Sequence, residues 1–280
     1  MRRPPLTAPR GTGEDDREGG PRLYVAATPL GNREDVTLRV LETLRRVPLV
    51  IAEDTRRARS LFAIYGIEGK RVESLFKGKE EVRTDDLIEK IRGVGEAVLI
   101  SEAGTPVISD PGYLLVERCR REGVPVIPLP GPCAAVAALS VAGLPAEPFL
   151  FLGFSPRKPG ELRHYLEGYL SLPFTLVLYE SPLRIEKTLE ALRELAPRRP
   201  LFLAREMTKL FEEHLSGSAE ELLAALTGRE IKGEITLVVG RGEKRPPRPE
   251  SREELVEILL RETGLSLKRL ERLLRRETPA

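Results

Sequence analysis

Residues 97–112 read AVLISEAGTPVISDPG, an apolar run that continues into a loop of glycine, proline and small polar residues. The apolar run predicts a strand over Ala97–Ser101, and the amphipathic sequence that follows the loop predicts a helix. The same succession begins at Arg22–Ala27, Leu49–Ala52 and Pro125–Pro128. Strands that alternate with helices favour parallel pairing with right-handed crossovers, so we predict an α/β fold.

The length of 280 residues favours about two domains. The stretch LPAEP at Leu144–Pro148 is typical of a linker, so we expect α/β domains over 22–143 and 149–240. In the first domain we predict helices over Val36–Arg46 and about Arg56–Tyr65. In the second we predict strands over Phe149–Leu152, Phe174–Tyr179, Leu201–Ala204, His214–Ser216 and Glu234–Val239, with helices between them that include Leu183–Leu195 and Ala219–Leu226.

Both ends of the chain differ from this pattern. Residues 1–21 carry proline, glycine, arginine and acidic residues with almost no apolar content, which predicts a disordered extension rather than a secretory signal. A cytoplasmic location is the resulting expectation. Residues 241–251 are a basic, proline-rich linker, and 252–280 predict two short amphipathic helices. This helix-turn-helix-like tail fits contact with phosphate or, equally, docking on its own domain or on a second subunit.

The composition excludes several classes of protein. Lys and Arg number 45 against 43 Asp and Glu, so the net charge is +2 and any basic surface must be local. Two cysteines do not make a disulfide scaffold, and His164 and His214 lie far apart, so we expect no zinc site. The patterns of a P-loop, of a dinucleotide fingerprint after the first strand and of a nucleophile elbow are missing from the sequence.

Loops at the carboxyl ends of the predicted strands hold the candidate ligand site, because open α/β sheets bind ligands there. Glycine and proline shape these loops, and small residues at 133–135 leave room for a flat ring or a ribose. Each loop alone also fits an ordinary turn, whereas four in one domain favour a ligand site. The four loops are TPLGN (28–32), EDTR (53–56), SEAGTPVISDPG (101–112) and PGPCAA (130–135). Cys119 lies on a helix position that predicts packing in the core.

Arginines flank the first two loops. Arg33, Arg56 and Arg57 fit contact with an anionic partner, and they equally fit ion pairs with neighbouring carboxylates such as Glu53 and Asp54.

Eight segments in uninterrupted order carry a family likeness. They are TPLGNREDVTLR (28–39), AEDTRRARSLF (52–62), SEAGTPVISDPG (101–112), LPGPCAAVAALSVAGLP (129–145), GFSPRK (153–158), YESPLRI (179–185), AREMTK with FEE (204–209 and 211–213) and KGEITLVV (232–239). Together they closely resemble the ribosomal RNA small subunit methyltransferases of the tetrapyrrole (corrin/porphyrin) methylase superfamily.

The resemblance implies a specific activity and architecture. It implies methylation of the ribose 2′-hydroxyl of a cytidine in the decoding region of small-subunit (16S) ribosomal RNA, with S-adenosylmethionine as donor. It also implies two α/β domains with the cofactor in the cleft between them, a homodimer, and an RNA or assembled small subunit as partner, with neither a membrane nor a metal. The positions that match the family's cofactor-binding segments are Ala103, Gly104, Thr105, Pro106, Ile108, Pro132, Cys133, Ala134, Tyr179, Glu180, Ala204, Arg205, Glu234 and Ile235.

A methyl donor that is already activated needs alignment and exclusion of water rather than a metal or a covalent nucleophile. A ribose hydroxyl is a poor acid, so a base should help. We predict that Glu53, Asp54 or Glu206 lies near the acceptor; pairing of these carboxylates with adjacent arginines is the alternative. For contact with the substrate we expect Asn32, Arg33, Arg56, Arg205 and Lys209.

Two other functions fit the same sequence. One is methylation of carbon on a tetrapyrrole by an enzyme of the same fold, which predicts a large flat pocket and no need for the arginines. The other is a non-catalytic RNA-binding assembly factor, which predicts affinity for RNA without turnover of the cofactor. Aromatic residues make up only 5%, so we expect recognition of a folded subunit rather than an extensive base-stacking surface.

Overall fold

The computed structural model describes residues 20–242 and the positions 256–257, 260 and 266–267. The predicted extension (1–21), linker (241–251) and tail (252–280) therefore lie largely outside the described residues. Among the residues described, no helix is both long enough and apolar enough for a passage through a lipid bilayer.

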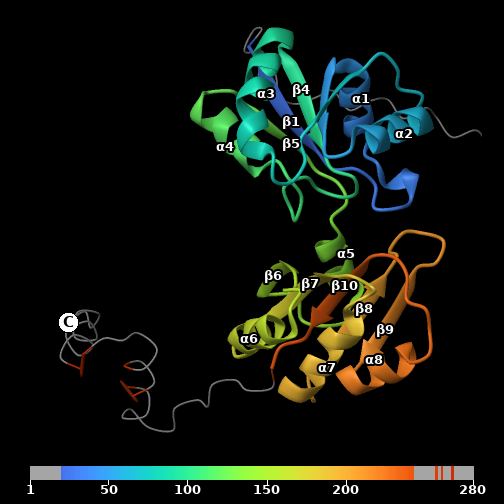
Figure 1. Cartoon of the computed structure of the whole chain (residues 1–280), viewed down its shortest axis with the longest axis vertical. Coiled ribbons are helices and arrows are strands. Elements are labelled where there is room, and N and C mark those ends of the chain that lie inside the picture. Colours follow the sequence, from blue (N-terminus) through green and yellow to red (C-terminus); the bar gives the residue numbers. More distant parts are fainter. Residues whose placement is uncertain (1–19, 243–255, 258–259, 261–265, 268–280) are drawn as a thin grey trace, which may run out of the picture.

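The first domain is built on a parallel sheet of five strands in the order β3-β2-β4-β1-β5. This confirms the predicted parallel pairing. The sheet is short because its strands have only four or five residues, and each ends in a loop at the same edge (Figure 1). The strands are β1 (Arg22–Ala26), β2 (Leu49–Ala52), β3 (Arg71–Ser74), β4 (Glu96–Ile100) and β5 (Val126–Leu129).

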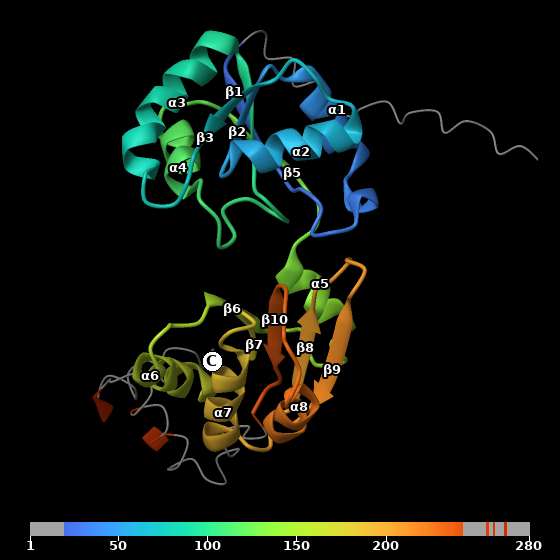
Figure 2. The same cartoon turned by 45° about the vertical axis from the view of Figure 1, so that its right-hand side comes forward.

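Helices cover both faces of this sheet. Alternate residues of β1 point to opposite faces: Tyr24 and Ala26 pack with α1 (Leu38–Arg46) and α2 (Thr55–Tyr65), whereas Leu23 packs with the other pair. That other pair is α3 (Glu80–Val94) and α4 (Tyr113–Arg121), and Figure 2 shows the two pairs on opposite sides of the strands. Cys119 of α4 is fully buried in this core, as its position predicted.

Local capping sets the start of α1. The helix begins at Leu38, two residues after the predicted start, because the Thr37 hydroxyl accepts a hydrogen bond from the Val40 N–H at 3.3 Å. Strand β3 and helix α3 were not among the predicted elements.

The second domain has a mixed sheet of five strands in the order β6-β7-β10-β8-β9. Only β6 and β7 run parallel, and the other neighbours are antiparallel. The strands are β6 (Phe149–Phe154), β7 (Thr175–Glu180), β8 (Leu201–Arg205), β9 (Glu213–Gly217) and β10 (Ile235–Val239).

One face of the second sheet is covered by three helices of its own domain. These are α6 (Pro159–Leu170), α7 (Ile185–Leu195) and α8 (Ala219–Leu226), which pack on leucines such as Leu176 and Leu237. The opposite face is covered by α5 (Ala134–Val141), which follows the last strand of the first sheet. Figure 1 shows α5 at the junction of the two domains.

Small side chains allow α5 to approach the second sheet. Ala135 and Ala138 are buried against Val177 and Val238, so the helix that leaves the first sheet is packed into the second domain. This contact holds the carboxyl edge of the first sheet beside the second sheet.

We predict that Ala138→Leu destabilises the protein, because a larger side chain at a position with no exposed surface must displace α5 from the sheet. The expected loss is about 1–3 kcal/mol in the free energy of unfolding, measured by urea titration. Val136→Leu on the same helix is the matched control, since Val136 is 56% exposed and the change should cost less than about 0.5 kcal/mol. Equal stability of the two variants would contradict the packing of α5.

Candidate functional site

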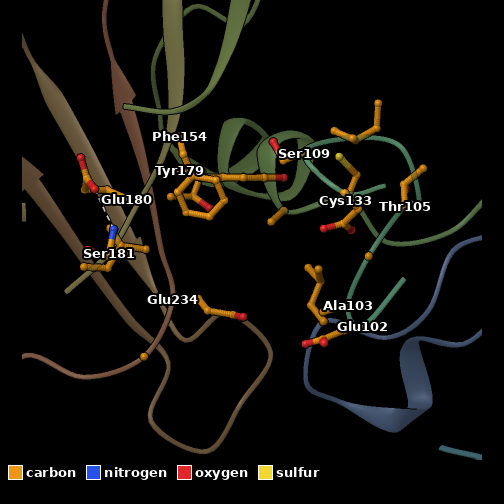
Figure 3. Close-up of a pocket in the computed structure, with 18 of the residues that line it drawn as sticks. Glu102, Ala103, Thr105, Ser109, Cys133, Phe154, Tyr179, Glu180, Ser181 and Glu234 are labelled. Atoms are coloured by element: carbon orange, nitrogen blue, oxygen red, sulfur yellow. Dashed lines mark hydrogen bonds between the residues drawn. The ribbon is translucent and has the colours of Figure 1, made fainter. Parts of the chain in front are cut away.

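A cavity of about 280 Å³ lies between the two domains. Its walls are mostly apolar, and several carboxylates lie among the lining residues (Figure 3). The first domain contributes Leu30, Glu53, Glu102, Ala103, Gly104, Thr105, Ile108, Ser109, Asp110, Cys133 and Ala134. The second contributes Phe154, Tyr179, Glu180, Ser181, Pro182, Gly233, Glu234, Ile235 and Thr236.

The first wall is made of loops that are fixed to one another. Thr28, after β1, and Gly104, after β4, exchange two backbone hydrogen bonds of 2.8 and 3.0 Å. The Ser101 hydroxyl donates to the Gly104 carbonyl at 2.9 Å, which fixes the turn from inside. Gly104 has φ +80°, and a side chain there would press on Leu30, so the backbone itself forms this part of the wall.

The long loop 101–112 is further held in an uncommon conformation. The Thr105 hydroxyl donates to the Pro132 carbonyl at 2.9 Å, and this bond joins the loop to the segment that precedes α5. Val107 and Ser109 both have φ near +70°, a backbone region that residues other than glycine rarely occupy. Such strain gathers at functional sites, where the surrounding structure enforces it.

Tyr179 joins the second wall to α5. The Ala135 N–H donates to its hydroxyl oxygen at 3.2 Å, and its ring makes edge contacts with Phe151 and Phe154. Burial raises the pKa of the tyrosine well above its usual range, so this hydroxyl stays protonated. Figure 3 shows Tyr179 and Phe154 of the second wall close to Ser109 and Cys133 of the first.

Glu180 anchors the turn after β7. Its buried carboxylate accepts hydrogen bonds from the Thr188 hydroxyl at 2.7 Å and the Ser181 N–H at 2.8 Å, and a further one from the Ser155 hydroxyl. Arg184 forms an ion pair with it at 2.7 Å. With these partners the carboxylate is satisfied, so it shapes the wall rather than offering a charge to a ligand.

Three carboxylates from the first domain converge at the cavity. Burial, and then the negative charges of Glu53 and Glu102, raise the pKa of Asp110 to about 6. Burial and the charge of Glu102 likewise raise the pKa of Glu53. The cavity is therefore electronegative and suits a cationic ligand. In the described part of the chain, no group of three or more His, Cys, Asp or Glu side chains is arranged to hold a metal ion.

The connection between β8 and β9, residues 206–212, reaches the first domain. The Asn32 N–H donates to the Thr208 hydroxyl at 3.0 Å. A Cβ on Gly31 would lie 2.2 Å from Cγ of Lys209, so glycine is what allows this approach. Lys209 in turn bridges Glu206 at 2.8 Å and the cavity residue Glu234 at 3.0 Å.

The three predicted catalytic carboxylates have different surroundings. Glu53 lines the cavity, and its carboxylate makes no hydrogen bond or ion pair within residues 20–242. Asp54 caps α2 by accepting from the Arg56 N–H at 2.7 Å, and this bond holds the pKa of its carboxyl below the usual value. Burial acts to raise the pKa of Glu206, but bonds from Lys209 and the Glu234 N–H outweigh it and lower the pKa.

Most of the residues that the resemblance assigns to the cofactor line the cavity. These are Ala103, Gly104, Thr105, Ile108, Cys133, Ala134, Tyr179, Glu180, Glu234 and Ile235. Pro106 and Ala204 are buried beside it, and Pro132 contributes the carbonyl that Thr105 bonds. Arg205 lies in the sheet, where Glu213 at 2.9 Å and the Lys232 carbonyl take up its guanidinium.

The residues expected to contact the substrate lie on separate segments and differ in exposure. Asn32 and Arg33 are exposed next to the 206–212 segment, and Arg56 is 88% exposed with only a loose pair to Asp54. Lys209 and Arg205 are held in ion pairs, which favours a structural role for them.

Several lining residues are not among the cofactor positions given one by one, but all of them lie in the eight segments that carry the resemblance. They are Leu30, Glu102, Ser109, Asp110, Phe154, Ser181, Pro182, Gly233 and Thr236. Leu30, Glu102, Ser109 and Asp110 also belong to the loops predicted to hold the ligand site. Phe154 is the last residue of β6, and its signal in the sequence was its place in the segment GFSPRK (153–158).

The chain has clear relatives. Residues 22–223 match the family model of the tetrapyrrole (corrin/porphyrin) methylases. The ribosomal RNA small subunit methyltransferase I of Hydrogenobaculum sp. (strain Y04AAS1) is 44% identical over 79% of this chain and 96% of the relative. The protein of the same name from Escherichia coli O157:H7 is 42% identical over 80% of this chain and 79% of the relative.

Solved structures share the fold at low identity. The methyltransferase CobJ has a TM-score of 0.62 at 23% identity and covers 81% of this chain and 96% of its own. Uroporphyrin-III C-methyl transferase from Thermus thermophilus, complexed with S-adenyl homocysteine, has a TM-score of 0.56 at 22% identity and covers 79% and 97%. These likenesses confirm the predicted two-domain α/β architecture.

The raised pKa of Asp110 predicts a pH-dependent stability of the ligand-free protein. The folded chain holds the proton up to about pH 6, whereas the unfolded chain releases it near 3.8, so the contribution of this group to stability falls as the pH rises between these values. Asp110→Asn should therefore melt at a higher temperature than the wild type at pH 7 and lose that advantage at pH 4, measured by differential scanning fluorimetry.

Asp85→Asn, which removes a 69% exposed aspartate from α3, is the matched control and should gain no such advantage at pH 7. A wild type that gains stability relative to Asp110→Asn between pH 4 and 7 would show that Asp110 is not a destabilised acid.

Proposed function

The chain belongs to the tetrapyrrole (corrin/porphyrin) methylase family, and on that premise we propose that it transfers a methyl group from S-adenosylmethionine to the ribose 2′-hydroxyl of a cytidine in the decoding region of small-subunit ribosomal RNA. The observation that carries the proposal is the apolar cavity between the domains, with Glu53, Glu102 and Asp110 converging on it. Relatives more than 40% identical are named ribosomal RNA small subunit methyltransferase I, which supports RNA as the acceptor.

The residues present fit the donor. The cavity volume of about 280 Å³ is close to the lower end of the roughly 300–1,000 Å³ of small-molecule sites. Gly104 and Ala134 offer backbone and small side chains against which a flat ring can lie. Asp110 and Glu53 supply negative charge that complements the positive sulfur and the ammonium group. The donor, when bound, supplies an electrophilic methyl group.

We assign the role of general base to Glu53. Asp54 is held by the first turn of α2, and Glu206 by Lys209, whereas the Glu53 carboxylate has no such partner among residues 20–242 and its pKa is raised. A raised pKa makes a carboxylate a better proton acceptor near neutral pH. The donor, when bound, would supply the methyl group and leave as the neutral thioether, and Glu53 would accept the proton of the ribose hydroxyl.

Two exposed arginines of the first domain suit a phosphate backbone. Arg33 and Arg56 have few internal partners, so they offer charge for the RNA. We further propose that the protein acts as a homodimer in the cytoplasm and recognises the assembled small subunit rather than a single strand, because the described surface offers few aromatic side chains for stacking.

A nucleoside assay tests the proposed function. Small subunits from cells that lack the gene are incubated with the protein and deuterated donor, then digested and examined by mass spectrometry. We expect labelled 2′-O-methylcytidine. Label on a base, or transfer to uroporphyrinogen with none to RNA, would refute the proposal, and binding of RNA without any transfer would favour a non-catalytic assembly factor.

We predict that Glu53→Gln lowers the single-turnover rate about 10²- to 10⁴-fold at saturating donor and RNA, because it removes the proton acceptor. The rise of the rate with pH should also disappear in this variant. Asp54→Asn and Glu206→Gln are matched controls that should keep the pH dependence of the wild type. The base assignment fails if Glu53→Gln retains both the rate and its pH profile.

A further inference from the structure

Two large apolar side chains stand exposed on the segment that joins β8 and β9. Leu210 is 90% exposed and Phe211 is 70% exposed. Exposure of an apolar side chain of this size to water is unfavourable. Most of the other aromatic rings in residues 20–242 are at least partly buried. We name residues 206–212 the hairpin tip.

The hairpin tip is rigid. Backbone bonds join the Lys209 N–H to the Glu206 carbonyl at 3.0 Å and the Glu212 N–H to the Lys209 carbonyl at 3.2 Å. The Glu212 carboxylate accepts from the Thr208 N–H at 2.9 Å and lies 2.9 Å from His214. Positive φ at Glu206 and Thr208 fits the same compact turn. A ring presented on such a turn loses little conformational entropy on binding.

The hairpin tip lies at the mouth of the cavity. Lys209, next to Leu210, reaches the cavity residue Glu234 at 3.0 Å, and Thr208 contacts Asn32 of the first domain. Figures 1 and 2 both show the connection between β8 and β9 directed toward the first domain. Any molecule that brings an acceptor into the cavity from this side passes over the tip.

A cation without an ion pair lies on the segment that the hairpin tip contacts. Arg33 follows Asn32, whose N–H donates to Thr208 of the tip, and the exposed Arg33 guanidinium forms no ion pair within residues 20–242. An exposed ring and an exposed cation on two segments in contact match a nucleotide, in which a planar base is linked to a phosphate. A protein that docked on this apolar surface alone would leave the Arg33 guanidinium without an anionic partner.

We propose that Phe211 stacks on a nucleobase of the RNA substrate while Arg33 pairs with a neighbouring phosphate, so that the hairpin tip positions the target ribose at the cavity. This inference rests on the proposed function, since it takes RNA as the acceptor. Phe211 is a positioning residue that does not touch the methyl group. Stacking by Phe211 alone does not require an extensive aromatic surface. Recognition of the folded subunit needs only one base to be held in place.

A series at one position tests the stacking. Methyl transfer to small subunits is measured for Phe211→Ala, Phe211→Leu and Phe211→Trp, together with the affinity for S-adenosylhomocysteine by calorimetry. We expect kcat/KM for the RNA to fall about 5- to 150-fold in the alanine and leucine variants and to stay within about threefold in the tryptophan variant. The affinity for S-adenosylhomocysteine should be unchanged throughout.

Two further measurements complete the test. Phe149→Ala is the matched control, because it removes a 44% exposed ring from the opposite end of the same sheet and should keep kcat/KM. Arg33→Gln should reduce the slope of log affinity against log salt by about one unit for small subunits, as expected for one lost phosphate contact.

The outcomes separate the two proposals. A wild type that methylates RNA while Phe211→Ala or Phe211→Leu is equally active overturns the stacking alone. A Phe211→Ala variant that changes its oligomeric state in analytical ultracentrifugation shows a contact with a second copy and also overturns it. A wild type that transfers no methyl group to RNA overturns the proposed function and the stacking with it.

Discussion

The packing of α5 on the second sheet is the contact on which the site depends. The chain leaves β5 of the first sheet, turns at Cys133, and enters a helix whose buried alanines lie against Val177 and Val238 of the other domain. This places the carboxyl edge of a parallel sheet, where loops bind ligands, opposite the ends of β7 and β10. Tyr179 then fixes the junction by accepting a hydrogen bond from the first turn of α5. The cavity exists because one short helix belongs to the first domain in sequence and to the second in packing.

Electrostatics gives this cavity its chemical preference. Asp110, Glu53 and Glu102 come from two loops of the first domain, and each raises the cost of ionising another. A ligand that carries positive charge relieves this repulsion. Binding of such a ligand should therefore raise the free energy of unfolding of the protein. The carboxylates with internal partners, Asp54, Glu180 and Glu206, instead hold helix α2, the turn after β7 and the hairpin tip in place. Glu102 also has a partner, since it pairs with Arg57 at 2.8 Å, so Glu53 is the carboxylate that is left without a hydrogen bond or ion pair within residues 20–242.

The sequence predicted the local elements of the fold. It did not predict strand pairing or side-chain contacts between segments that lie far apart in the chain. Strands, helices and the loops at 101–112 and 130–135 follow from periodicity and from glycine and proline, and the α/β architecture follows from their order. The antiparallel arrangement of the second sheet did not, because pairing of β10 between β7 and β8 joins segments far apart in the chain. The same limit applies to the carboxylates: the sequence offered Glu53, Asp54 and Glu206 as equals, and only the fold shows that two of them have partners. The exposure of Phe211 could not be predicted either, since a phenylalanine between Leu210 and Glu212 fits an edge strand as well as a turn.

A crystal structure of the complex with S-adenosylhomocysteine shows directly whether the donor occupies the cavity between the domains. We expect electron density for the ligand between the loop 101–112 and the residues 179–182 and 233–236, with its sulfur on the side of the cavity that Glu53 lines. Density for the ligand elsewhere on the protein, or a cleft closed by side chains at saturating ligand, would contradict it.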